Sequence, residues 1–304
     1  MHEDDFEYLK RRLEAAYGPA DAARALAGLD CEHPVTLRAN ALKSSTEEIA
    51  SALDGAGVAY ARVPWYGDAF VLASAREPQV RELDIYEQGH IYLQSLSSML
   101  PPLALEPRAG ENILDMTAAP GGKTTQIAAL ADGGALVTAC EKNPIRADRL
   151  RFNLERQGAS RVSVMQTDAR KLDDFFSFDK VLLDAPCSGS GTLTPRARAK
   201  AGFSEKLVRR SAKTQAALLG KALSVLAPGG MLVYSTCSIL PEENENVVRA
   251  AIARAKCEVE LVPAVDEGLA SHLPQLPTAL EGTVCVCPDL LFEGFFMAKL
   301  KRVG

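Results

Sequence analysis

Residues 112–124 read NILDMTAAPGGKT, a short apolar run that ends at Asp115 and leads through Pro120 and two glycines into a helical stretch. The apolar run predicts a buried strand, and residues 122–131 fit the helix after it. Glycine in the turn lets the backbone approach a ligand closely. The stretch therefore predicts a strand–turn–helix unit with a ligand site at its turn.

The alternation of strand and helix continues along the chain. Apolar runs predict strands over residues 135–140, 162–167, 180–185, 231–236 and 295–300, with helices at 144–157, 204–226 and 241–255. Near-continuous apolar strands that alternate with helices are typical of a parallel sheet covered on both faces. We therefore predict a doubly wound α/β sheet, which binds its ligands at the carboxyl ends of the strands.

The residues before about 110 follow another pattern. Ser45 and Glu48 have the spacing of a capping box, which predicts a helix that ends near Gly55. Short β-like runs follow at residues 59–63 and 69–73. This part predicts a small α+β unit that precedes the doubly wound sheet.

Composition excludes several classes of protein. The 304 residues include 34 Lys and Arg against 39 Asp and Glu, a net charge of −5, and 47% are hydrophobic, which describes a globular chain and not a disordered one. The acidic start lacks a signal-peptide pattern, and no run approaches 18 apolar residues. Seven cysteines, an odd number, indicate reduced thiols. We expect a cytoplasmic protein without a membrane span.

Polar or reactive residues end five of the predicted strands: Asp115, Glu141, Asp168, Asp184 and Cys237. One acidic residue in such a place is usually a helix cap. Five of these residues at one edge of one sheet are better explained by a ligand site.

The glycine turn does not match the common phosphate-binding motifs. Gly122, Lys123 and Thr124 resemble the end of a nucleotide-binding loop, but that motif needs a glycine at position 117, where this chain has Thr. The dinucleotide motif fails because Gly121 and Gly122 are adjacent and no third glycine follows at the required offset.

The acidic strand ends favour a nucleoside that carries positive charge. Glu141 is placed to accept hydrogen bonds from both ribose hydroxyls, and Asp168 to meet an adenine edge. S-adenosylmethionine, which has a sulfonium and an amino group, fits this edge. We expect it as the cofactor.

Two cysteines follow neighbouring predicted strands, Cys187 in DAPCSGSG (184–191) and Cys237 in STCS (235–238). A free cysteine is usually a small buried apolar residue. These two stand among Pro, Gly and Ser at strand ends, where core thiols are less expected.

The thiols and Asp184 suit methylation of carbon 5 of a pyrimidine. That carbon is a poor nucleophile until a thiolate adds to carbon 6, and a base must then remove the carbon 5 proton so that the thiol can leave. The attacking thiol needs a lowered pKa, aided by Lys123 or a helix amino terminus. Asp184 is placed to act as an acid at ring nitrogen 3. Spacing alone leaves open whether Cys187 or Cys237 attacks.

The chain resembles the RNA cytosine-5 methyltransferases of the Sun type. The resemblance rests on DMTAAPGGKT (115–124), DAPCSGSG (184–191), and STCS (235–238) with PEENE (241–245). It extends to LRANALK (37–43), GHIYLQSLSSMLPP (89–102) and EGFFMAKLK (293–301), and so covers most of the chain.

The resemblance implies a role for each motif. Cys237 corresponds to the nucleophile and Cys187 to the cysteine that assists product release. The family's cofactor site maps to Ala118, Ala119, Pro120, Gly121, Gly122, Lys123, Thr124, Glu141, Asp168 and Asp184. The implied fold is a Rossmann-like class I methyltransferase sheet over residues 96–304, preceded by an RNA-recognition-like α+β domain over residues 1–95.

The expected partner is RNA, ribosomal or transfer. Residues 194–213 carry a charge of +6, and we expect RNA backbone contacts there from Arg196, Arg198, Arg209 and Arg210, although such a run is often only a solvated helix face. Neither a membrane nor a metal is expected, and the chain is expected to be a monomer. Cys285 and Cys287 form a pair without a second pair, which favours strand thiols over a metal site.

Two positions near the C-terminus depart from the family pattern. Cys285 and Asp289 stand where family members often have Arg and His. Two alternatives to an RNA methyltransferase stay open: a noncatalytic RNA-binding assembly factor, and a methyltransferase that acts on proteins or small molecules.

Overall fold

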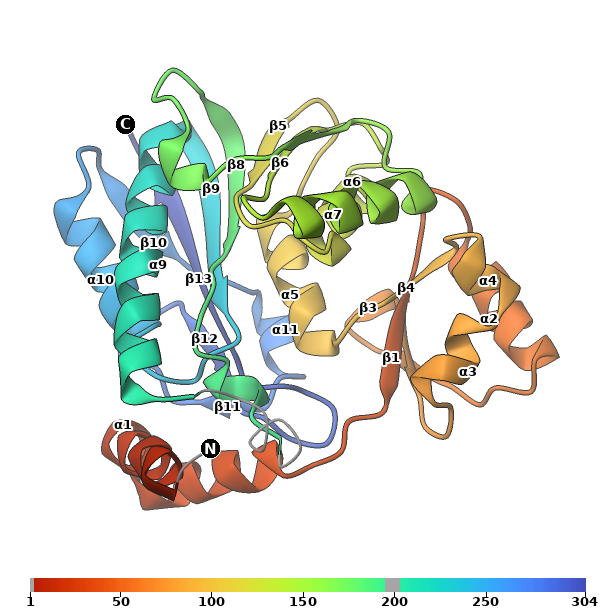
Figure 1. Ribbon diagram of the computed structural model, residues 1–304, viewed down its shortest axis with the longest axis horizontal. Helices are drawn as coiled ribbons and strands as arrows, with labels where there is room; N and C mark the ends of the chain where they lie inside the picture. The colour runs from red at the N-terminus through yellow and green to blue at the C-terminus, as the bar shows by residue number, and fades with distance from the viewer. Residues whose placement is uncertain (1–2, 195–202) are drawn as a thin grey trace. The chain divides into compact units, whose positions relative to one another are not determined.

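The computed structural model of the protein describes residues 3–194 and 203–304 (Figure 1). The chain forms two compact units. We call residues 34–171 the central unit, and residues 1–33 together with 172–304 the split unit. The division into domains at residue 95 stays a prediction.

The central unit begins with a four-stranded antiparallel sheet in the order β2-β3-β1-β4. Its strands are β1 (Val35–Ala39), β2 (Ala61–Val63), β3 (Tyr66–Leu72) and β4 (Ile91–Leu93), and its helices are α2 (Thr46–Gly55), α3 (Glu77–Arg81) and α4 (Asp84–Glu87). The predicted capping box at the start of α2 is confirmed, because Ser45 Oγ accepts from Glu48 N and a Glu48 carboxylate oxygen accepts from Ser45 N.

Helix α2 packs its apolar face on this small sheet. Ile49 and Leu53 of α2 are fully buried against Leu37 and Phe70 of the sheet, together with Val80 of α3. The alternation of apolar residues along β1 and β3 and the helical spacing of Ile49 and Leu53 thus build one small core.

The rest of the central unit is a parallel α/β arrangement. Strands β5 (Asn112–Asp115), β6 (Leu136–Cys140) and β7 (Val162–Met165) pair in parallel, with helices α5 (Leu96–Leu105), α6 (Gly122–Leu130) and α7 (Pro144–Gln157) and the short η1 (Ala169–Lys171). Helix α7 has clear sequence boundaries, because Asn143 caps its start, Pro144 opens it and Gly158 ends it in a left-handed conformation.

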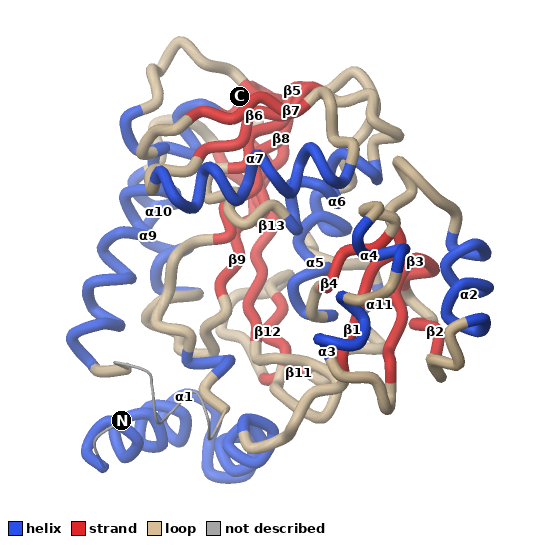
Figure 2. Tube along the Cα trace, turned by 45° about the vertical axis from the view of Figure 1, so that its right-hand side comes forward, coloured by secondary structure: helices blue, strands red, loops and turns tan. Residues whose placement is uncertain are grey.

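The split unit holds the remaining strands, in the order β11-β12-β13-β9-β8, with β10 on β13. The strands are β8 (Phe178–Asp184), β9 (Leu226–Thr236), β10 (Val259–Val262), β11 (Gln275–Leu276), β12 (Val284–Val286) and β13 (Phe295–Arg302). The helices are α1 (Glu3–Leu29), η2 (Ser190–Thr192), α9 (Glu205–Val225), α10 (Glu245–Arg254) and α11 (Glu267–Ala270). Helix α9 packs on β8 and β9, and α10 packs on α9 (Figure 2).

The prediction of parallel strands is wrong for the last strands of the sheet. Strands β8 and β9 are parallel, but β13 runs antiparallel to β9 and also pairs antiparallel with β10 and β12. Six residues of β13, from Phe295 to Leu300, are buried in succession. A continuous apolar run shows that both faces of a strand are covered, and it carries no information on strand direction.

Candidate active site

The turn after β5 is held by the side chain that ends the strand. Asp115 is 1% exposed, and its carboxylate accepts from Thr124 Oγ1 at 2.7 Å and from Thr117 N at 3.3 Å. Gly121 caps α6 with a φ of 112°. A Cβ at this position would lie 3.0 Å from the Leu150 side chain, so both conformation and space favour glycine.

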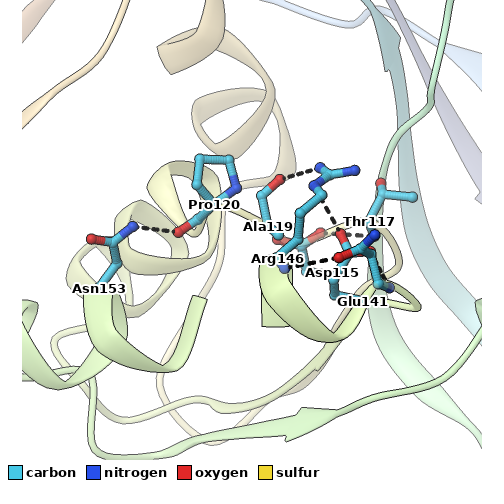
Figure 3. A network of polar contacts seen from close by, with 8 residues as sticks. Asp115, Thr117, Ala119, Pro120, Glu141, Arg146 and Asn153 are labelled. Carbon is cyan, nitrogen blue, oxygen red and sulfur yellow. Dashed lines mark hydrogen bonds and ion pairs between the residues drawn. The ribbon is translucent and has the colours of Figure 1, made fainter. Parts of the chain in front are cut away.

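Helix α7 fixes the same turn from the other side (Figure 3). Arg146 Nη2 donates to the carbonyl oxygen of Ala119 at 2.8 Å, and Asn153 Nδ2 donates to that of Pro120 at 2.7 Å. The Arg146 guanidinium also lies 3.5 Å from a Glu141 carboxylate oxygen. These contacts hold the predicted cofactor loop and Glu141 in one place.

Glu141 and Asp168 follow adjacent strand ends, as predicted. Glu141 is 5% exposed, one of its carboxylate oxygens accepts from Asn143 N at 2.8 Å, and its own N–H donates to the Met165 carbonyl of β7 at 3.1 Å. Asp168 forms an ion pair with Arg170, whose hydrogen bonds lower the pKa of Asp168 to about 2. Both carboxylates thus lie at the edge of the sheet where the nucleoside is predicted to bind.

Lys123 lies in the central unit, where its Nζ donates to Ser98 Oγ at 2.8 Å. The two cysteines that it was predicted to assist lie in the split unit. Its assistance to a thiol therefore stays a prediction.

Cys187 and Cys237 lie side by side in the split unit, as their positions after neighbouring strands predicted. Their Sγ atoms are 2.9 Å apart, and both are free thiols. The parallel register of β8 and β9 pairs Asp184 with Ser235, and Asp184 Oδ1 accepts from Ser235 Oγ at 2.8 Å. The hydrogen bond with Cys237 and burial raise the pKa of the Cys187 thiol well above its ordinary value. Cys187 therefore keeps its proton at neutral pH.

A buried carboxylate that our sequence reasoning did not assign connects the two cysteine loops. Glu243, fully buried, accepts from Ser188 N at 2.7 Å, from Ser188 Oγ at 2.5 Å and from Ser238 Oγ at 2.7 Å. Burial raises its pKa. Glu243 belongs to the PEENE stretch, whose acidic composition gave no sign that Glu243 and Glu245 would both be buried.

Further contacts of the backbone and of two serine hydroxyls connect the two cysteine loops. Gly191 N donates to the Cys237 carbonyl at 3.0 Å, and the hydroxyls of Ser190 and Ser238 lie 2.8 Å apart. A Cβ on Gly191 would lie 2.1 Å from the Gly294 carbonyl oxygen, so the backbones of the Cys187 loop and of the approach to β13 touch there. The relative position of the two thiols is thus set by a network of hydrogen bonds.

Glu243→Ala is expected to lower the free energy of unfolding by about 2–4 kcal/mol, because the buried Ser238 hydroxyl and two half-buried donors of Ser188 lose their acceptor. Urea denaturation measures this change. Glu258→Ala, which removes an exposed carboxylate of the same unit, is the matched control. Equal stability of the two variants would show that Glu243 does not hold the loops.

The predicted RNA contacts lie partly outside the described residues. Arg196 and Arg198 fall within residues 195–202, which the structure does not describe. Arg209 pairs with Glu205 one helical turn away, and Arg210 is exposed on α9. Their role in RNA binding stays a prediction.

Cys285 lies in β12 and Cys287 directly follows it, and both are buried, as the interpretation as strand thiols requires. The Tyr17 hydroxyl lies 3.6 Å from Cys285 Sγ, and burial raises the pKa of Cys287 to about 11. Over residues 3–194 and 203–304, no three His, Cys, Asp or Glu side chains group as metal ligands. Within the same ranges, every helix is too short or too polar to cross a membrane.

The acidic side chains at the ends of β5, β6 and β7 and the pair of adjacent thiols are the features that the resemblance to a class of enzyme, the nucleoside-dependent methyltransferases, predicted. Comparison with known families supports this assignment. The family model described as 16S rRNA methyltransferase RsmB/F matches residues 102–301, and a ferredoxin-like domain of the same family matches residues 7–79. The chain belongs to the RsmB/F family of 16S rRNA methyltransferases.

Curated relatives carry the name ribosomal RNA small subunit methyltransferase F. The protein of Shewanella sp. (strain ANA-3) is 37% identical over 285 residues, which cover 90% of this chain and 57% of the relative. The protein of Shewanella loihica is 35% identical over 286 residues, 90% of this chain and 58% of the relative. The chain thus spans less than two thirds of the length of these relatives.

Solved structures confirm the predicted fold class. A methyltransferase homolog from Pyrococcus horikoshii has a TM-score of 0.83 at 32% identity and covers 99% of this chain and 100% of its own. NSun6 from the same organism, solved with SFG, has a TM-score of 0.86 at 26% identity and covers 97% and 98%. The resemblance to Sun-type methyltransferases and the Rossmann-like sheet with a ferredoxin-like N-terminal part are confirmed.

Proposed function

We propose that this protein transfers a methyl group from S-adenosylmethionine to carbon 5 of a cytosine in small-subunit ribosomal RNA. The observation that carries the proposal is the pair of free thiols 2.9 Å apart at the ends of β8 and β9. Their loops match the motifs of an rRNA methyltransferase family. The names of the curated relatives favour ribosomal over transfer RNA.

The residues of the central unit fit the proposed cofactor. The carboxylates of Glu141 and Asp168 end adjacent strands, and the lowered pKa of Asp168 keeps that carboxylate ionised at neutral pH. Carboxylates suit a nucleoside with a sulfonium and an ammonium group, and would repel phosphates. Glu141 and the 118–124 turn would hold the nucleoside, which supplies an electrophilic methyl group when bound.

Glu141→Gln is expected to weaken S-adenosylmethionine binding roughly ten- to 100-fold, because hydrogen bonds from the ribose hydroxyls to a charged acceptor become bonds to a neutral one. Isothermal titration calorimetry measures the affinity. Glu155→Gln changes an exposed carboxylate of α7 in the same unit and should bind as the unsubstituted protein does. Unchanged affinity of Glu141→Gln would place the ribose elsewhere.

The two thiols have different proposed roles in the reaction: Cys237 forms the covalent bond to the cytosine, and Cys187 assists its release. The Cys237 thiolate adds to carbon 6 of the cytosine, so that carbon 5 can take the methyl group. Loss of the carbon 5 proton to a base then breaks the bond between sulfur and carbon 6. We assign Cys187, a neutral thiol with its Sγ 2.9 Å from the Cys237 Sγ, to this release step: it would donate its proton to the departing Cys237 sulfur, while the carbon 5 proton goes to a separate base. Asp184 is proposed to hold a proton toward ring nitrogen 3.

Transfer of labelled methyl groups to purified RNA tests the function. With S-adenosylmethionine labelled in its methyl group, an unmodified small-subunit rRNA transcript should accept label and transfer RNA transcripts should not. Label on transfer RNA alone would contradict the ribosomal assignment. RNA binding without any transfer would favour the noncatalytic assembly factor.

A further inference from the structure

The central unit contains a cavity of about 460 Å³, within the roughly 300–1,000 Å³ range of small-molecule sites. Its wall includes Arg81, Tyr86, Tyr92, Arg149, Phe152 and Arg156. The first three come from α3, α4 and β4 of the small sheet, and the last three from α7. Apart from Tyr92, which lies in the 89–102 stretch of the family resemblance, none of them belongs to the methyltransferase motifs found in the sequence.

Two arginine guanidinium groups of this cavity lie over its aromatic rings. The Arg156 guanidinium lies 4.5 Å from the ring centre of Tyr86 and 5.7 Å from that of Phe152, and the Arg81 guanidinium lies 5.1 Å from Tyr86. Each of these distances lies within the range of about 6 Å over which a guanidinium is attracted to an aromatic ring. The cavity therefore has a wall of planar groups on which a further flat group can stack.

The aromatic ring of Phe152 is exposed at the wall of this cavity. Its side chain is 62% exposed, although it is a large aromatic residue beside a cavity. An exposed aromatic ring next to a hollow is characteristic of a binding surface, since the ring gains by being covered.

The charge of the wall is positive. Arg81 pairs with Glu77, but Arg149 is exposed on α7 and the Nε of Arg156 is buried with no hydrogen-bond acceptor in the described part of the chain. The described residues that line the cavity include three arginines and no carboxylate, so the site favours a ligand that carries negative charge. Guanidinium groups pair well with phosphate oxygens.

The cavity also adjoins the predicted cofactor loop. Pro120 of that loop is part of its wall. The Tyr92 ring lies so close to Gly122 that a Cβ there would be 2.9 Å from it. A ligand in the cavity thus lies beside the loop that we assign to the methyl donor.

We propose that this cavity binds one nucleotide of a single-stranded segment of the substrate RNA. The base stacks on Phe152, and the phosphate meets Arg149 and Arg156. Aromatic stacking combined with basic contacts to the backbone is how proteins hold single-stranded RNA. The choice of RNA rests on the proposed function; an acidic peptide would need the arginines but not the exposed ring.

Binding of a ten-nucleotide oligouridine, measured by fluorescence anisotropy at several salt concentrations, tests the proposal. This probe lacks cytosine, so its binding is independent of methyl transfer. Phe152→Ala should weaken binding roughly five- to 100-fold and leave the salt dependence unchanged. Arg149→Ala should weaken binding and reduce the slope of log affinity against log salt by about 0.7, the value for one phosphate contact to a single strand.

Two variants serve as matched controls. Phe175 is 97% exposed in the split unit, and Arg151 lies on α7 with its guanidinium paired to Asp148. Phe175→Ala and Arg151→Ala should bind the oligouridine as the unsubstituted protein does. If Phe152→Ala and Arg149→Ala behave like these controls, the cavity is not an RNA site.

Different experimental results would overturn the cavity proposal and the proposed function. Loss of oligouridine binding in Phe152→Ala supports the cavity even if no RNA ever accepts a methyl group. Methyl transfer to ribosomal RNA with unchanged binding by Phe152→Ala overturns the cavity proposal and leaves the function intact. Weaker binding by Arg149→Ala together with unchanged binding by Phe152→Ala also overturns the cavity proposal, because no base then stacks on the Phe152 ring.

Discussion

Cys187→Ala should leave protein covalently attached to RNA after denaturation. Without the Cys187 thiol, the Cys237 adduct at carbon 6 forms and accepts the methyl group, but its release is slowed. The two sulfur atoms are 2.9 Å apart, so the release group lies directly beside the bond that must break. A gel shift in denaturant, after incubation with the transcript and S-adenosylmethionine, measures the adduct.

The double variant Cys187→Ala/Cys237→Ala controls for nonspecific attachment and should form no adduct. If Cys237→Ala traps RNA and Cys187→Ala does not, the two roles are exchanged. In cells, sequencing of RNA that remains attached to Cys187→Ala would identify the target cytosine.

Cys237→Ser should reduce methyl transfer at least about 1,000-fold, because a serine hydroxyl is a far weaker nucleophile than a thiolate near neutral pH. The side chain is close in size, so the loop network around Glu243 should persist. Binding of S-adenosylmethionine, whose proposed contacts lie in the central unit, should be unchanged.

Retained activity of Cys237→Ser would point to the alternative of a methyltransferase that needs no covalent bond to its substrate. The urea midpoint of Cys237→Ser separates loss of chemistry from loss of folding. A variant that is inactive, binds cofactor and unfolds at the unsubstituted midpoint has lost only the nucleophile.

The sequence predicts the parts of the fold that local signals determine. Asn143, Pro144 and Gly158 delimit α7 at residues 144–157 as predicted, and the Ser45–Glu48 capping box starts α2. Helix α5 was not predicted, because it contains Pro101 and Pro102, which normally interrupt a helix. The direction of β13 was missed because its apolar run records burial on both faces and not orientation.

The candidate site was predictable where it depends on motifs and not where it depends on packing. Spacing placed Cys187 and Cys237 after neighbouring strands, and the structure brings their sulfur atoms together. The role of Glu243 follows from a fold that buries this acid between Ser238 and Ser188, which is 55 residues away in sequence. The cavity at Phe152 likewise needs α7 and the small sheet to meet, which no local pattern encodes.

The most direct test of carbon 5 methylation is the release of tritium from RNA labelled at carbon 5 of its cytosines. Replacement of that hydrogen by a methyl group should release tritium to water in a one-to-one ratio with methyl groups transferred from S-adenosylmethionine. Cys237→Ser should release none. Methyl transfer without tritium release would place the methyl group on another atom and contradict the covalent mechanism proposed for Cys237.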